Sequence, residues 1–312
     1  MKKSVKIILA ALVALMMCGV SYAQELSQAA EMYNNAVNSL NNGDDAAALE
    51  SFQGAYKIAV ALGEEGAALA NDCKAVIPKV MYKIGKTAAA AGDYAGAETK
   101  LAEALKTAEE FEDAAALEDI KALFSQVKMA LGNTALSSKD YATAIEKAGK
   151  AVELNPSNTK ALVVLGMAKV DSGDEAGAVE AFTKAKELGD DSGFKQMAKE
   201  YLLKANAAMK AKDFNGAVAA GLKSIEFNET PNAHKIVGIS AFNAKKYDQA
   251  IKSLEFVVSN SQKADNERYY LARAYEAKGN NAKACENYKA ASNAANKQIA
   301  DFCKAKAAAL CK

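Results

Sequence analysis

The feature that most constrains this chain is a helix-breaking stop that recurs along it. Each stop is a Gly or Lys followed by a polar residue, as in Gly173-Asp174, a pairing that can end one helix and cap the next. Seven stops are centred near residues 43, 92, 139, 173, 212, 245 and 279. Successive stops are therefore 49, 47, 34, 39, 33 and 34 residues apart. A period in this range predicts a solenoid of helix pairs.

Small residues recur at two fixed places around every stop. One lies seven residues before the stop and the other five residues after it, where a larger side chain would push the two helices of a hairpin apart. A generic Ala-rich bundle would not keep Gly or Ala at both places in all seven hairpins. The first set is Ala36, Gly85, Gly132, Gly166, Ala205, Gly238 and Ala272, and the second is Ala48, Ala97, Ala144, Ala178, Ala217, Ala250 and Ala284.

This pattern resembles the tetratricopeptide repeat. In the repeat around Gly173, the residues that match the family pattern are Leu162, Leu165, Gly166, Ala178, Phe182 and Ala185, whereas Lys169 stands where the family has an aromatic residue. The resemblance implies an all-α fold, a right-handed α-solenoid of about seven helical hairpins with a C-terminal capping helix at 296–311. It covers nearly all of residues 24–312, which we interpret as one continuous domain. The first two, longer gaps keep a helical rhythm and predict lengthened first helices.

The N-terminus has the pattern of a secretory signal peptide over residues 1–23. Three lysines precede an apolar run from Ile8 to Val20, and Ser21-Tyr22-Ala23 is a small-x-small cleavage site. Lipid attachment at Cys18 is the alternative, although Met17 stands where lipidation normally needs a small residue. We therefore expect an exported protein of a Gram-negative-type envelope, located in the periplasm, associated with the outer membrane, or secreted.

Charge and hydropathy exclude two classes of protein. Of 39 basic and 38 acidic residues, removal of the signal takes away three lysines and leaves 36 against 38, a net charge of −2. A nearly neutral chain is not typical of a nucleic-acid binder. After the signal, no segment is apolar for long enough to span a bilayer.

Cysteine usage fits an oxidising compartment. The mature chain keeps Cys73, Cys285, Cys303 and Cys311. Cys303 and Cys311 would lie about 12 Å apart on one helix, too far for a disulfide. Cys285, on the preceding antiparallel helix, could bond either Cys303 or Cys311, and buried free thiols are the alternative.

Residues suited to catalysis are scarce, so we predict no enzyme activity, no cofactor and no metal site. His234 is the only histidine, and it falls at a packing position of its repeat. No phosphate-binding Gly-rich loop and no hydrolase or metalloprotease motif occurs. The cysteines and the single histidine lack zinc-ligand spacing.

The resemblance implies that a ligand would lie along a concave groove lined by the first helices. The candidate groove residues on this basis are Tyr33, Tyr82, Lys83, Lys86, Asn133, Met167, Asn206, Lys235, Tyr269 and Arg273. With Met129, Val163, Leu202 and Tyr270, which the same positions place in the groove, the surface has a basic, tyrosine-containing start, an apolar middle and an aromatic-basic end. Tyr and Arg are frequent hot-spot residues in interfaces.

Two functional hypotheses follow. The first is an exported scaffold that binds a protein or peptide in the concave groove, without catalysis. The second is a structural or assembly component of a cell-envelope complex, acting through its convex surface or by self-association. The sequence identifies neither the partner nor the oligomeric state.

Overall fold

The computed structural model describes residues 2–261 and 263–311, with side chains described from Tyr22 onward. Over this range the chain is helical and no strand is described. The prediction of an all-α fold of helical hairpins is thus confirmed. Two compact units make up the chain, the first ending at Leu188 and the second beginning at Gly189. No helix within the described residues is long and apolar enough to cross a membrane.

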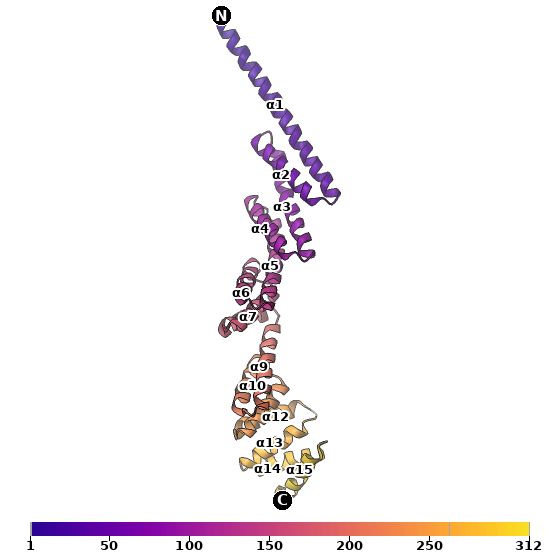
Figure 1. The fold of residues 1–312 in the computed structure, drawn as a ribbon, viewed down its shortest axis with the longest axis vertical. Helices are drawn as coiled ribbons and strands as arrows, with labels where there is room; N and C mark the ends of the chain where they lie inside the picture. The colour runs from indigo at the N-terminus through magenta and orange to yellow at the C-terminus, as the bar shows by residue number, and fades with distance from the viewer. Residues whose placement is uncertain (1, 262, 312) are drawn as a thin grey trace. The chain divides into compact units, whose positions relative to one another are not determined.

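The first unit contains four helical hairpins (Figure 1). Its first helices are α1 (Lys2–Asn41), α3 (Ala67–Ala90), α5 (Ala114–Ser137) and α7 (Thr159–Ser172), and its second helices are α2 (Asp45–Ala61), α4 (Tyr94–Glu110), α6 (Tyr141–Leu154) and α8 (Glu175–Glu187). The helices of each hairpin pack together, and α5 also contacts α3 and α7. Helices α3, α5 and α7 therefore form one row along this unit.

The second unit contains three hairpins and a final helix. Its first helices are α9 (Ser192–Lys210), α11 (Pro231–Asn243) and α13 (Asp265–Ala277), and its second helices are α10 (Phe214–Phe227), α12 (Tyr247–Asn260) and α14 (Asn281–Ala290). A 3-10 turn at Ala291–Asn293 leads into α15 (Lys297–Leu310), which packs on α14 and also contacts α13. Helix α15 lies within the segment for which the sequence predicts a capping helix.

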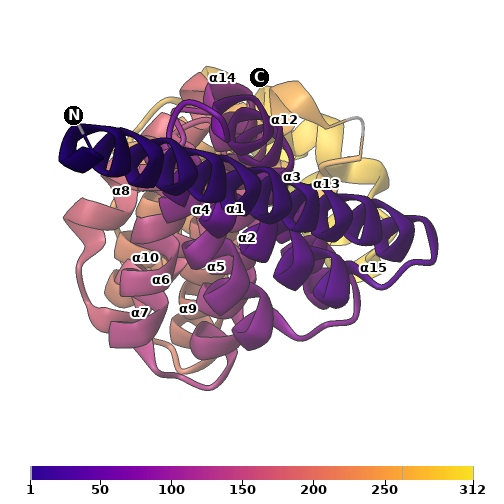
Figure 2. The same ribbon diagram turned by 90° about the horizontal axis from the view of Figure 1, so that it is seen from above.

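Figure 2 shows α1 as a single unbroken helix. The predicted signal peptide, 1–23, falls almost wholly on residues whose side chains lie outside the described part of the chain. It therefore stays a prediction, as does the single domain over 24–312.

The stops use one local geometry to turn the chain between the helices of a hairpin. In four of them a glycine takes a left-handed backbone conformation, for example Gly173 at φ 91°. In the other three a lysine takes it, at φ 62° for Lys139 and 60° for both Lys212 and Lys245. Left-handed backbone is unfavourable for any residue with a Cβ, so these three turns carry strain that glycine would relieve.

The second, polar residue of a stop caps the second helix of the hairpin. Its side-chain oxygen accepts a hydrogen bond from the backbone amide three residues later, as when Asp174 accepts from Gly177 at 2.9 Å. Such a cap satisfies one of the amide groups that the first turn of a helix leaves unpaired. The residues that cap in this way are Asp44, Asp93, Asp140, Asp174, Asp213 and Asn280. Lys246, in the sixth hairpin, makes no such bond.

The small residues on either side of each stop are all buried. A Cβ added to Gly166 would lie 2.2 Å from Cε1 of Phe182, and one added to Gly85 would lie 2.7 Å from Cδ2 of Leu101. Both contacts are far closer than carbon atoms tolerate. The glycine of the first helix therefore makes room for the bulky residue of the second, which explains the recurring spacing.

One half-buried charge cluster links three helices of the first unit. Glu98 of α4 lies 2.5 Å from Nζ of Lys128 on α5 and 2.8 Å from Nζ of Lys147 on α6. Burial alone would raise the pKa of the Glu98 carboxyl, but the hydrogen bonds from both lysines outweigh burial and lower that pKa. The cluster therefore stabilises the packing of the second hairpin on the third while Glu98 is ionised.

A disulfide closes the end of the second unit. Cys285 of α14 is bonded to Cys311, with a Cα–Cα distance of 5.4 Å. The disulfide therefore joins α14 to the C-terminal end of α15. Of the two partners left open by the sequence, Cys311 takes the bond and Cys303 remains a buried free thiol. Cys73 is also free and buried, and burial with the nearby Asp72 raises the pKa of its thiol to about 11.

Candidate functional site

A hollow in the first unit lies across the row of first helices. We call it the Lys86–Lys160 hollow, and its volume is about 730 Å³. Its lining comes from α3, the start of α4, α5, and the turn that leads into α7. The lining residues are Lys86, Ala89, Ala90, Tyr94, Leu123, Gln126, Val127, Met129, Ala130, Asn155, Ser157, Asn158, Thr159 and Lys160.

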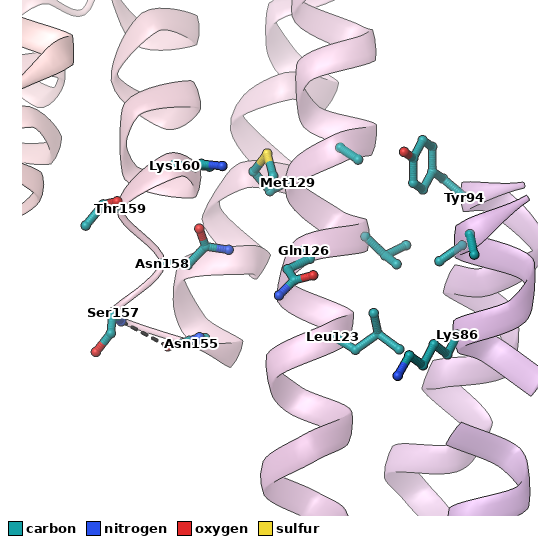
Figure 3. Close-up of a pocket in the computed structure, with 14 residues that line it drawn as sticks. Lys86, Tyr94, Leu123, Gln126, Met129, Asn155, Ser157, Asn158, Thr159 and Lys160 are labelled. Carbon is teal, nitrogen blue, oxygen red and sulfur yellow. Dashed lines mark hydrogen bonds between the residues drawn. The ribbon is translucent and has the colours of Figure 1, made fainter. Parts of the chain in front are cut away.

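Apolar residues of α5 lie between two lysines in this hollow. Figure 3 shows Lys86 on one side and Lys160 on the other, with Leu123, Gln126 and Met129 of α5 between them. Such an arrangement offers apolar contact along the middle and positive charge at both ends.

Both lysines are exposed and free to meet a ligand. The Nζ of Lys86 lies 5.9 Å from the centroid of the Tyr82 ring on the same helix. Among the residues that the structure describes, no carboxylate lies within ion-pair distance of Lys86 or Lys160. Within the described residues their positive charges therefore have no carboxylate partner, unlike those of Lys83 and Lys128.

The turn that carries Lys160 is held by two asparagines. The side-chain oxygen of Asn155 accepts a hydrogen bond from the amide of Ser157 at 3.1 Å. Asn158 caps α7 through Ala161 and donates to the hydroxyl of the buried Ser125 on α5 at 2.9 Å. These bonds fasten the start of α7 against α5, and Lys160 lies in that first turn.

Of the predicted groove residues in the first unit, Lys86 and Met129 line the hollow. Tyr33 is half-buried and packs edge-on against Phe52, with ring centroids 5.1 Å apart. Lys83 pairs with Asp45 at the start of α2, at 2.7 Å. The other predicted residues are Tyr82 and Met167, both half-buried, and Asn133, which is exposed.

In the second unit, Arg273 lines a separate, smaller hollow. Tyr269 accepts a hydrogen bond from Arg273 beside it. Lys235 instead pairs with the buried Glu267 at 2.6 Å, and the side-chain amide of Asn206 donates to the carbonyl of Leu202 at 3.0 Å. Lys235 and Asn206 therefore have partners within the unit.

His234 is buried, as a packing residue would be. Its ring stacks on Phe256 with centroids 3.9 Å apart, and its Nε2 lies 2.9 Å from a carboxylate oxygen of Glu229. It lines neither the Lys86–Lys160 hollow nor the hollow at Arg273. The geometry therefore places no histidine base where a ligand could reach it in these hollows.

The sequence interpretation missed several residues that line the hollows. Gln126 lies one turn before Met129 on α5, and helical spacing could have identified it. Lys160 and its turn could not be placed, because the sequence does not show which side of a connecting turn faces the preceding hairpin.

Comparisons with known proteins agree with the repeat pattern. A family model described as tetratricopeptide repeat matches residues 129–193 and 238–297. The first segment contains α6, α7 and α8, and the second contains α12, α13 and α14. The matches identify tetratricopeptide repeats in these two segments, and together with the hairpin fold they support a tetratricopeptide repeat protein.

Solved structures of other repeat proteins resemble parts of the chain. YrrB, described as a tetratricopeptide repeat protein with an unusual peptide-binding site, is 20% identical over 66% of this chain and 97% of its own, with a TM-score of 0.33. A tetratricopeptide repeat protein from Parabacteroides merdae is 15% identical over 90% and 99%, with a TM-score of 0.32. The TPR2AB domain of yeast Sti1, solved in a complex with pHSP90, is 15% identical over 94% and 100%, with a TM-score of 0.37. No curated protein matches the chain.

Proposed function

We propose that this protein is an exported scaffold that binds a protein or peptide partner in the Lys86–Lys160 hollow and catalyses no reaction. Tetratricopeptide repeats suggest a protein-interaction scaffold. The observation that carries the proposal is the hollow itself, an apolar strip on α5 between two lysines that have no carboxylate partner among the described residues. A partner segment with acidic groups on either side of apolar residues would complement it.

A pull-down with charge-reversed variants tests the proposal. The hollow variant combines Lys86→Glu with Lys160→Glu. Its control combines Lys100→Glu with Lys106→Glu on α4, where both lysines are exposed and pair only with exposed glutamates of the same helix. Both variants reverse two exposed charges in the same unit, and the control also gives up two exposed ion pairs within α4.

We expect the unmodified protein and the control to capture the same partner from an envelope fraction, and the hollow variant to lose it. Equal capture by all three proteins would overturn the proposed site. If the mature protein instead self-associated with increasing concentration and captured no partner, the envelope-assembly hypothesis would replace this proposal.

Export is a separate part of the proposal. It is supported by the basic start, the apolar run and the small-x-small site of residues 1–23. Mass spectrometry of the protein recovered from an envelope fraction is expected to give a chain that begins at Gln24. A lipid-modified chain that begins at Cys18, or an uncleaved chain in the cytoplasm, would contradict simple cleavage and export.

A further inference from the structure

A second candidate site lies in the second unit, around Arg273 of α13. Three aromatic rings hold its guanidinium group, whose carbon lies 4.8 Å from the ring centroid of Phe242, 5.2 Å from that of Tyr269 and 5.9 Å from that of Phe302. One guanidinium nitrogen also donates a hydrogen bond to the hydroxyl of Tyr269 at 2.8 Å. The rings and this bond already hold the guanidinium group in place. The Arg273 side chain would therefore lose little conformational freedom when a ligand binds to it.

The guanidinium keeps unused hydrogen-bonding capacity. Arginine has five N–H donors in a planar fork, and one bond to a neutral hydroxyl leaves most of them available. Within the described residues, no carboxylate lies within ion-pair distance of Arg273. The nearest acidic side chain in the lining, Glu276, already has two partners, Nζ of Lys306 at 2.5 Å and the hydroxyl of Tyr288 at 2.7 Å.

The guanidinium opens into a hollow of about 350 Å³. The lining residues are Phe242, Tyr247, Arg273, Glu276, Ala277, Phe302 and Lys306. The charged residues of the lining are Arg273, Glu276 and Lys306, so the lining carries a net charge of +1 beside three aromatic rings. One ligand group with a single negative charge would bring the lining to neutrality.

We propose that this hollow, which we call the Arg273 hollow, binds an acidic side chain of a partner protein together with a neighbouring apolar side chain. A carboxylate matches the guanidinium fork and can accept two parallel hydrogen bonds from it. The apolar neighbour packs against the rings of Phe242 and Phe302. The site is independent of the Lys86–Lys160 hollow and does not rest on its proposed role.

The charge of the lining favours a carboxylate over a phosphate group. A phosphate monoester carries nearly two negative charges at neutral pH. A phosphate group would therefore bring more negative charge than the net charge of +1 in the lining can balance, and it would lie next to the carboxylate of Glu276. A carboxylate carries a single charge and balances the lining.

The test is selection of peptides from a library of octapeptides displayed inside a loop, so that no peptide has a free terminus. The mature full-length chain is expected to enrich peptides in which Glu or Asp lies next to an aromatic or aliphatic residue. Enriched peptides, made with capped ends, are then measured by fluorescence anisotropy beside versions in which Gln replaces Glu and phosphoserine replaces Glu.

Three variants locate the binding. Arg273→Lys keeps the charge and loses the fork, and it is expected to weaken the Glu peptides at least about tenfold. Lys304→Gln, which removes an exposed charge from α15 outside the lining, is expected to leave affinity within about twofold. Lys86→Glu with Lys160→Glu is expected to leave these peptides bound, so loss of one site is distinguishable from loss of the other.

Several results would overturn the proposal. They are a selection without acidic enrichment, Gln peptides that bind as well as Glu peptides, phosphoserine peptides that bind more tightly than Glu peptides, or Arg273→Lys binding with unchanged affinity. Circular dichroism of Arg273→Lys controls for folding. This substitution keeps most of the aliphatic stem, so the unit should remain intact.

Discussion

Replacing the strained lysines of two turns by glycine should stabilise the second unit. Lys212 and Lys245 take left-handed backbone at φ 60°, at stops where other hairpins use glycine. That conformation costs a residue with a Cβ about 1–2 kcal/mol. Glycine gains about 0.4–1 kcal/mol of freedom in the unfolded chain, which offsets part of the relief. The net gain is about 0.5–1 kcal/mol per site.

The double variant Lys212→Gly with Lys245→Gly should therefore gain about 1–2 kcal/mol in free energy of unfolding. For a unit of this size, each kcal/mol raises Tm by about 3–6 °C. Thermal unfolding followed by circular dichroism at 222 nm measures the shift, and urea unfolding checks it without heat.

Lys252→Gly is the matched control. Lys252 is exposed in the interior of α12, where glycine costs about 1 kcal/mol relative to good helix formers. The same substitution should therefore raise Tm at the stops and lower it on the helix. A fall in Tm at both kinds of position would refute the reasoning that the turns are strained.

Three further predictions concern packing, pH and the disulfide. Gly166→Ala should destabilise the first unit by about 1–3 kcal/mol because its Cβ would overlap the Phe182 ring. Gly149→Ala places its Cβ in open space, so it should raise the free energy of unfolding by up to about 1 kcal/mol. The midpoints of urea unfolding compare the two variants. The pKa of Glu98 is lowered in the folded chain, so its contribution to stability is present above the unfolded pKa of about 4.3 and is lost as pH falls through the folded pKa. Glu98→Gln should therefore flatten the dependence of the urea midpoint on pH below about 5. An unchanged slope would contradict this role of Glu98. Cys311→Ser should lower the stability of the second unit by about 2–4 kcal/mol, and a reducing agent should then change its Tm little, in contrast to its effect on the unmodified chain.

Much of the fold could be predicted from the sequence because the stops and small residues act locally. Asp174 caps α8 through a residue three positions away, and Gly166 meets Phe182 within a single hairpin. Such contacts repeat at fixed spacing, so they leave a periodic pattern in the sequence. For the disulfide, helix geometry left two candidate partners for Cys285, namely Cys303 and Cys311. In the structure Cys285 is bonded to Cys311.

The candidate sites could be predicted only in part. Lys86 and Arg273 follow from their places on first helices, and both line hollows. Lys83 and Lys235 occupy similar places, but they pair with Asp45 and Glu267 on neighbouring helices. Helical spacing shows which face a side chain occupies and does not show which partner a long, flexible lysine reaches. For the same reason the sequence could not distinguish a lysine that is free for a ligand from one already paired.

Site-specific photocrosslinking from the Lys86–Lys160 hollow tests the central claim most directly. A photoreactive phenylalanine analogue would replace Gln126 in the hollow and, in a separate variant, Lys100 on the outer face of α4. The proposed function predicts that the Gln126 variant forms a crosslink to one partner from the envelope and that the Lys100 variant does not. A crosslink from Lys100 alone would place the partner on the second helices and contradict binding in the hollow.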